Sequence, residues 1–128
     1  MSQMDIAATM DALAAACVNA GVVANGYGWP AGSVTVPCVL VAFPEPVEYD
    51  QTFGNAAMRA VFPVYLLAGP KDLKSSRDIL SAALLPMKAA LDAVSGVQTA
   101  RVTIASFAPV AINEIEYAGC RFDVEVYD

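Results

Sequence analysis

The stretch MRAVFPVYLLAGPKDLKSSRDILSAALLPMKAALDAVSGVQTARVTIASFA, Met58–Ala108, decides the fold. It predicts a strand over Met58–Ala68, a break at Gly69-Pro70, a helical segment over Lys71–Val94 and a second strand over Thr99–Ala108. Apolar residues recur along the helical segment at steps of seven, four, three, four and three, which keeps them on one side of a helix: Leu73, Leu80, Leu84, Met87, Leu91 and Val94. A one-sided helix between two apolar strands has to cover one face of a sheet, because neither element can bury its apolar side alone.

Two prolines in this stretch predict local disturbances. Pro63 has no N–H and removes one hydrogen bond from the ladder, so we expect the first strand to be bulged or to lie near an edge. Pro86 removes a main-chain hydrogen bond and clashes one turn back, at a cost of ~3 kcal/mol in a straight helix. We therefore expect a kink at Pro86, or two helices that meet near Leu85.

The N-terminal part predicts one helix followed by a long loop. Ser2 and Asp5 approximate a capping box, and an amphipathic helix is expected from about Met4 to Ala20, ended by Gly21. Glycines, prolines and Asn25-Gly26 predict loop and turns as far as Ser33.

The next strand is expected over Thr35–Phe43, where Pro37 indicates an edge or a strand start. Val47–Tyr49 is expected to resume pairing before a polar, hairpin-like excursion that leads to Met58.

The C-terminal part predicts a hairpin. Val110–Ile115 reads as one strand, Glu116–Gly119 as the turn, and Cys120–Tyr127 as a strand in which apolar and polar residues alternate. Together, the elements predict one α+β domain over residues 1–128. We expect about five strands in a mainly antiparallel sheet or sandwich, with the N-terminal helix and the kinked helical crossover packed on one side.

The composition favours a subunit of an assembly. Hydrophobic residues make up 57% of the 128 residues and charged residues 16%, against roughly 45–50% and about 25% in typical soluble domains. Either a membrane or other subunits could cover that excess. The longest apolar run, Ile6–Val23, is interrupted by Asp11, which is expensive in a bilayer. No Lys or Arg precedes the run, as a signal peptide would require. We therefore expect no membrane partner.

The net charge of −6 argues against a general nucleic-acid-binding surface, which needs clustered Lys and Arg. An acidic wall repels phosphate, however, so DNA could still pass along such a protein as cargo.

The residue types offer little catalytic chemistry. The chain has no His, which excludes Ser-His-Asp and Cys-His catalysis and most zinc sites. Cys17, Cys38 and Cys120 are far apart and odd in number, and we expect three reduced, mostly buried thiols in a cytosolic protein.

Two acidic pairs, Glu114 with Glu116 and Asp123 with Glu125, could lie across the predicted hairpin on one strand face. Such a patch could hold a divalent cation. A solvated strand face with Arg121 nearby is the favoured interpretation. We expect no catalytic residue, no metal, no cofactor and no enzymatic activity.

Five segments together resemble a known family. They are VPCVLVAFPEPVEYDQTF (Val36–Phe53), MRAVFPVYLLAG (Met58–Gly69), RDILSAALLPMKAALDAV (Arg77–Val94), ARVTIASF (Ala100–Phe107) and IEYAGCRFDVEVYD (Ile115–Asp128). This succession resembles the tail terminator proteins of long-tailed, siphovirus-type actinobacterial phages. The resemblance covers nearly the whole chain from Val36 onward and is weaker over the N-terminal helix. Relatives usually have a more polar, glycine-containing joint where this chain has Leu84-Leu85-Pro86.

The resemblance implies a structural role in the virion, at the head–tail junction, after assembly in the host cytoplasm. Tail terminators form a ring, usually hexameric, that caps the tail tube, ends its polymerisation and joins it to the head connector. The implied partners are further copies of the chain, the major tail tube protein and the head–tail connector or neck protein, with DNA passing through the ring. On this reading we expect the Tyr49–Ala57 excursion and exposed strand edges to carry subunit or tube contacts. The residues expected to make them are Tyr49, Asp50, Thr52, Phe53, Asn55, Met58 and Arg59.

Two alternatives stay open. The protein could be a neck or head-completion connector subunit of the same virion, or a small metal-binding protein that uses the acidic strand face.

Overall fold

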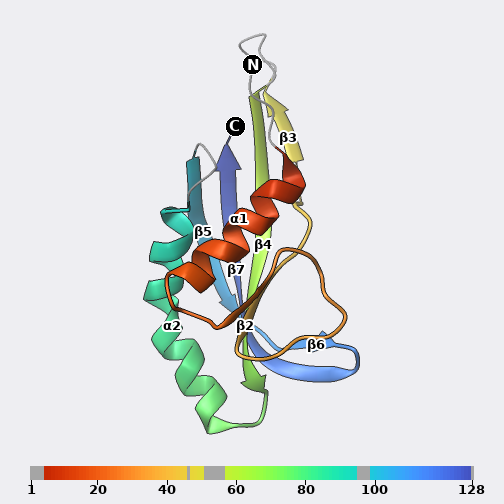
Figure 1. Ribbon diagram of the computed structural model, residues 1–128, viewed down its shortest axis with the longest axis vertical. Helices are drawn as coiled ribbons and strands as arrows, with labels where there is room; N and C mark the ends of the chain where they lie inside the picture. Colours follow the sequence, from red (N-terminus) through yellow and green to blue (C-terminus); the bar gives the residue numbers. More distant parts are fainter. Residues whose placement is uncertain (1–4, 46, 51–56, 95–98, 128) are drawn as a thin grey trace.

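The computed structural model describes residues 5–45, 47–50, 57–94 and 99–127 (Figure 1). The elements follow in the order α1 (Ile6–Asn19), β1 (Asn25–Tyr27), β2 (Cys38–Val41), β3 (Val47–Asp50), β4 (Ala57–Pro70), α2 (Lys74–Asp92), β5 (Thr99–Phe107), β6 (Val110–Ile112) and β7 (Ile115–Tyr127).

The strands form one sheet, and both helices pack on the same face of it (Figure 1). The strand order is β1-β2-β4-β7-β5, with β3 paired to β4 and β6 paired to β7. Among the strands described here, β1 and β2 are the one parallel pair, and the other pairs are antiparallel. The predicted α+β class is confirmed, as a mainly antiparallel sheet with the N-terminal helix and a second helix on one side. The residues that the structure describes form seven strands, where about five were expected.

β4 is the central strand of the sheet, as its apolar sequence predicts. It pairs with β2 and β3 on one side and with β7 on the other. Phe62, Val64 and Leu66 face the helices and belong to the core, and Pro63 and Leu67 on the opposite face are also buried. A strand that is buried on both faces needs apolar residues at every position.

Pro63 disturbs the neighbouring strand and not its own. We expected β4 to be bulged or to lie near an edge: it is irregular, but between Leu67 and Gly69 and not at Pro63, and it lies in the centre of the sheet. The N–H of Ala42 donates to the Pro63 carbonyl (3.0 Å), but proline has no N–H to return. β2 accordingly ends at Val41, and pairing to β4 resumes only with β3.

α1 is shorter than predicted at its N-terminus. Asp5, not Ser2, is the N-cap, and its carboxylate accepts a hydrogen bond from the Ala8 N–H at 3.0 Å. Gly21 ends the helix as predicted, with φ +77°, a conformation that favours glycine.

β1 was not predicted. Asn25-Gly26 is typical of a turn, yet these residues pair with Cys38 and Val39 of β2. Gly26 lies directly against α1, because a Cβ atom there would come within 3.0 Å of the Ala14 carbonyl oxygen.

α2 runs without interruption through Pro86, so the alternative of two helices that meet near Leu85 is wrong. Its predicted stripe is largely correct, since Leu80, Met87 and Leu91 are buried. Leu73 is exposed, because it is the residue that precedes the helix and its backbone is extended.

The C-terminal hairpin turns earlier than predicted. Asn113 and Glu114 form the turn with φ values of 51° and 69°, and β7 then runs unbroken from Ile115 to Tyr127. The predicted turn at Glu116–Gly119 is therefore wrong. Gly119 marks a close approach instead, because a Cβ atom there would meet Val110 Cγ2 at 2.8 Å.

Candidate interaction surface

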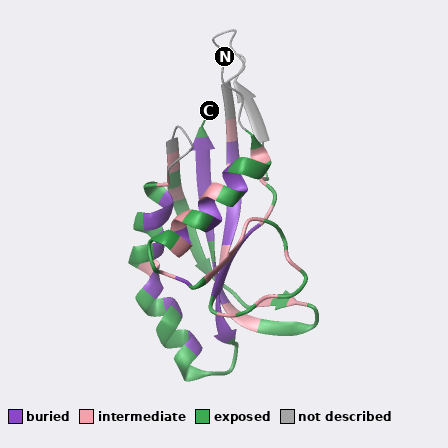
Figure 2. Ribbon diagram, viewed as in Figure 1, coloured by how far each residue is buried: buried purple, intermediate pink, exposed green. Residues whose placement is uncertain are grey.

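The sheet ends at β5, an edge strand with no further partner among the residues that the structure describes. All of its residues from Thr103 to Phe107 are exposed, whereas most of β4 and most of β7 from Gly119 to Val126 are buried (Figure 2). An unpaired edge presents its N–H and C=O groups to another chain, unless something covers them.

A groove runs between β5 and α2, and we call it the edge groove. It consists of two hollows of about 520 Å³ and 240 Å³ that share Leu84. The larger hollow is lined by Lys71, Arg77, Leu80, Ser81, Leu84, Phe107 and Ala118. The smaller one is lined by Leu84, Leu85, Lys88, Val102, Thr103, Ile104, Ala105 and Phe122. The lining is thus mainly apolar, with Lys or Arg side chains in each hollow.

Large apolar side chains are exposed in and beside this groove. Leu85 is 77% exposed, Phe107 58% and Ile104 56%. A register shift between Val102 and Ile104 explains the position of Ile104, because it places this side chain opposite Asp123 instead of on the core side with Val102. The sequence predicts Val102 and Ile104 on one face, and the bulge separates them.

Asp92 fixes the C-terminal end of α2 to β5. Its Oδ1 accepts a hydrogen bond from the Val102 N–H at 2.8 Å, and its other oxygen pairs with Lys88. Burial opposes ionisation of this carboxyl, but the contacts with Lys88 and Val102 outweigh it and lower the pKa of Asp92. These contacts hold the C-terminal end of α2 against β5, beside the smaller hollow.

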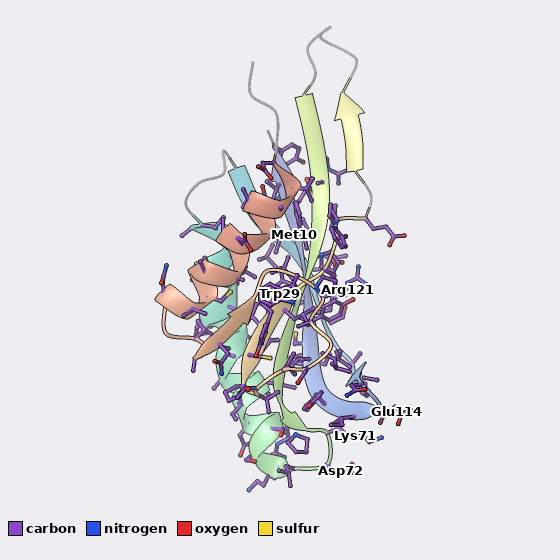
Figure 3. The ribbon with its side chains drawn as sticks, turned by 45° about the vertical axis from the view of Figure 1, so that its right-hand side comes forward. Met10, Trp29, Lys71, Asp72, Glu114 and Arg121 are labelled. Carbon is purple, nitrogen blue, oxygen red and sulfur yellow. The ribbon has the colours of Figure 1, made fainter. Side chains whose placement is uncertain are left out.

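The acidic residues singled out in the sequence do not form one patch. Glu114 lies in the β6–β7 turn, far along the sheet from Arg121 (Figure 3). Glu116 pairs with Lys71. Because β7 is continuous, Glu116 and Asp123 are seven residues apart on one strand, or roughly 23 Å at 3.3 Å per residue. The expected arrangement across a hairpin is wrong. Among the described residues, no group of three His, Cys, Asp or Glu side chains could hold a metal ion.

Glu125 belongs to an ion cluster that joins three strands. Its carboxylate pairs with Arg59 of β4 at 2.9 Å and with Arg101 of β5 at 3.8 Å, and it accepts a hydrogen bond from the Tyr127 hydroxyl. Glu125 is only 6% exposed. The hydrogen bonds from Arg59 and Tyr127 lower the pKa of Glu125 to about 2. This arrangement stabilises the sheet. Arg59 was expected in an interface, and its guanidinium takes part in this cluster.

The other residues expected in an interface are described in part or not at all. In the ladder between β3 and β4, Tyr49 is opposite Met58 and Asp50 is opposite Ala57. The structure describes the backbone of these residues but not their side chains. Thr52, Phe53 and Asn55 lie wholly outside the described residues.

The three cysteines are free and buried, as predicted. Burial raises the pKa of Cys17 to about 12 and that of Cys38 to about 11. A thiol that stays protonated is a poor nucleophile and a poor metal ligand, so these residues act as small apolar side chains.

The sequence analysis expected contacts at exposed strand edges but did not identify the edge groove or its residues. From α2 it takes Leu80 and Leu84 of the predicted apolar stripe together with exposed side chains outside that stripe, and the rest of the wall comes mainly from β5 and β7. The only local signal is that Leu85 and Phe107 fall outside the apolar stripes that face the core.

No protein-family model matches the sequence, and a comparison with curated proteins gives no match. None of the described helices is both long and apolar enough to cross a membrane.

Proposed function

We propose that this protein is a subunit of a homomeric ring and that the ring is a tail terminator of a long-tailed phage. It would cap the tail tube, end its polymerisation and join it to the head connector, with DNA passing through the ring. The observation that carries the proposal is the edge groove, where an open strand edge adjoins exposed Leu85, Ile104 and Phe107.

This surface suits a permanent neighbour. Large exposed apolar side chains that adjoin one another mark interaction sites on soluble proteins, and a free strand edge supplies directional hydrogen bonds to go with them. The resemblance of the sequence from Val36 onward to tail terminators supplies the identity of the assembly.

A ring also agrees with the order of the strands. β5 lies at one edge of the sheet and β1 at the other, so a contact between unlike edges joins copies head to tail. Such heterologous contacts close into a ring when the rotation allows it.

The net charge of −6 agrees with DNA as passing cargo. We expect weak duplex binding at physiological salt, because few phosphate contacts could form. Tight binding in a fluorescence-anisotropy titration would contradict this part of the proposal.

Native mass spectrometry of the purified protein, alone and with the tube protein of the same virion, tests the proposal. We expect a closed oligomer of six copies, and tubes whose growth stops when it is added. A protein that stays monomeric under both conditions would refute the ring. A pull-down that recovers the portal adaptor but not the tube protein would point instead to a neck or head-completion subunit.

A further inference from the structure

The charges of this chain are divided unequally along the sequence. All seven basic residues lie between Arg59 and Arg121, whereas the segment before Arg59 contains five carboxylates and no Lys or Arg. That acidic segment forms α1, β1, β2 and β3. The basic residues include Lys71, Arg77 and Lys88 in the lining of the edge groove.

An exposed aromatic side chain lies on the acidic part, on the connection between β2 and β3. Phe43 is 66% exposed, and Glu45 beside it is also exposed. The connection is fixed to β4 at both ends, because the Ala42 N–H donates to the Pro63 carbonyl and the Glu45 N–H donates to the Val61 carbonyl at 2.9 Å. We call Ala42–Glu45 the aromatic corner.

The aromatic corner and the edge groove lie on opposite sides of the central strand β4. β2 and β3 flank β4 on one side, while β7 and β5 follow on the other. Figure 1 shows β3 and the connection that leads to it across the sheet from α2 and β5. One copy cannot bring the two surfaces together, but a second copy can.

The basic residues of the groove are available to a new partner. Arg77 is 70% exposed on its side chain and pairs with its own neighbour Asp78, and Lys71 pairs with Glu116 at the surface. Exposed pairs of this kind contribute roughly 0–1 kcal/mol, so they can exchange partners at little cost.

We propose that the aromatic corner of one copy docks into the edge groove of the next. Phe43 enters the larger hollow, between Leu80, Leu84 and Phe107 of the neighbour, and Glu45 pairs with Arg77 at its rim. This inference rests on the proposed ring, and it specifies the contact that closes it. An apolar side chain thus fills an apolar hollow, and a carboxylate meets a guanidinium. The two contacts together favour one relative position of the two copies over others.

Two single variants and their mixture test the head-to-tail geometry. Phe43→Asp removes the corner and leaves the groove intact; Phe107→Asp does the reverse. Both side chains are exposed, so circular dichroism should show normal folding. We expect each variant alone to be monomeric, with the apparent dissociation constant raised by roughly a hundredfold or more, as for a central aromatic contact. An equimolar mixture should stop at dimers in native mass spectrometry, because each mixed pair retains one intact contact.

A charge exchange tests the register. Glu45→Arg and Arg77→Glu should each weaken assembly, and the double variant should restore it, because the ion pair forms again with its signs exchanged. Lys74→Glu is the matched control, since Lys74 is exposed on the same helix but does not line the groove. It should assemble like the original protein.

The outcomes separate the two proposals. Rings that form normally with Phe43→Asp or Phe107→Asp would overturn this contact and leave the ring intact. A double charge variant that assembles no better than the single ones would overturn the register. An original protein that is monomeric even with the tube protein would refute the ring and the contact together.

Discussion

Arg59 and Glu125 lie on neighbouring strands, and Arg59 Nη2 is 2.9 Å from Glu125 Oε2. They are diagonal neighbours in the β4–β7 ladder, since Glu125 is opposite Val61 and Arg59 is opposite Tyr127. The Glu125 side chain is largely shielded from water, so its ionisation depends on these partners.

This ion pair predicts a loss of stability in acid. The pKa of Glu125 is about 2 in the folded protein and near its ordinary value of 4.5 in the unfolded chain. The folded state therefore gains stability from Glu125 above pH 4.5, and that gain disappears as the pH falls toward 2. Urea unfolding from pH 2 to pH 7 should show a smaller pH dependence for Glu125→Gln. Parallel profiles for both proteins would contradict this assignment.

Truncating a side chain on the core side of α2 should lower the free energy of unfolding much more than truncating one on its outer side. Leu91 is fully buried, whereas Leu85 on the same helix is 77% exposed. Leu91→Ala should lower the free energy of unfolding by about 2–5 kcal/mol, because it removes buried methyl groups and leaves a cavity. Leu85→Ala is the matched control and should change it by less than about 0.5 kcal/mol. These values refer to unfolding of the monomer, measured by chemical denaturation.

Pro86 should destabilise the protein at its position inside α2. It is exposed inside α2 and cannot donate to the carbonyl of Ala82. Pro86→Ala should raise the free energy of unfolding by about 1–3 kcal/mol, because it restores the missing helix hydrogen bond. A lower melting temperature for this variant would mean that the proline is required for packing at that position.

Gly28 should not tolerate a side chain, although it lies in a loop. A Cβ atom there would come within 3.0 Å of Asp11 Cα and 3.1 Å of Asp11 N, so α1 would have to move. Gly28→Ala should lower the free energy of unfolding by about 1–3 kcal/mol, as overpacking does. Gly32→Ala is the control, because nothing lies within 4 Å of that position. Equal melting temperatures for the two variants would contradict the close contact of this loop with α1.

Most of the elements were predictable from local pattern. The alternation of Phe122, Val124 and Val126 identified the core face of β7, and the periodicity of Leu80, Met87 and Leu91 identified the inner face of α2. Several of the errors occurred at glycines and prolines, because these residue types fit more than one local structure. Gly26 and Gly119 read as turn residues, yet each lies in a strand where another segment passes too close for a side chain.

The composition of the chain predicted that an apolar surface is covered by a partner, but the position of that surface was not predictable. An excess of apolar residues and a shortage of charge indicate that something covers this protein, but not where. The edge groove depends on β5 being the last strand and on the bulge beside Thr103. Neither follows from the residues of β5 alone, because both are set by its pairing with β7.

The sequence by itself determined the class of fold, the two core-facing patterns and the lack of histidine chemistry, because each depends on residue types at fixed spacing. Only the tertiary structure decided that Glu125 is buried in an ion cluster, that Pro63 interrupts its neighbour and that the groove beside β5 stays open. These features arise between residues far apart in the chain. A local pattern specifies which side of an element is apolar, but not which other element comes to cover it.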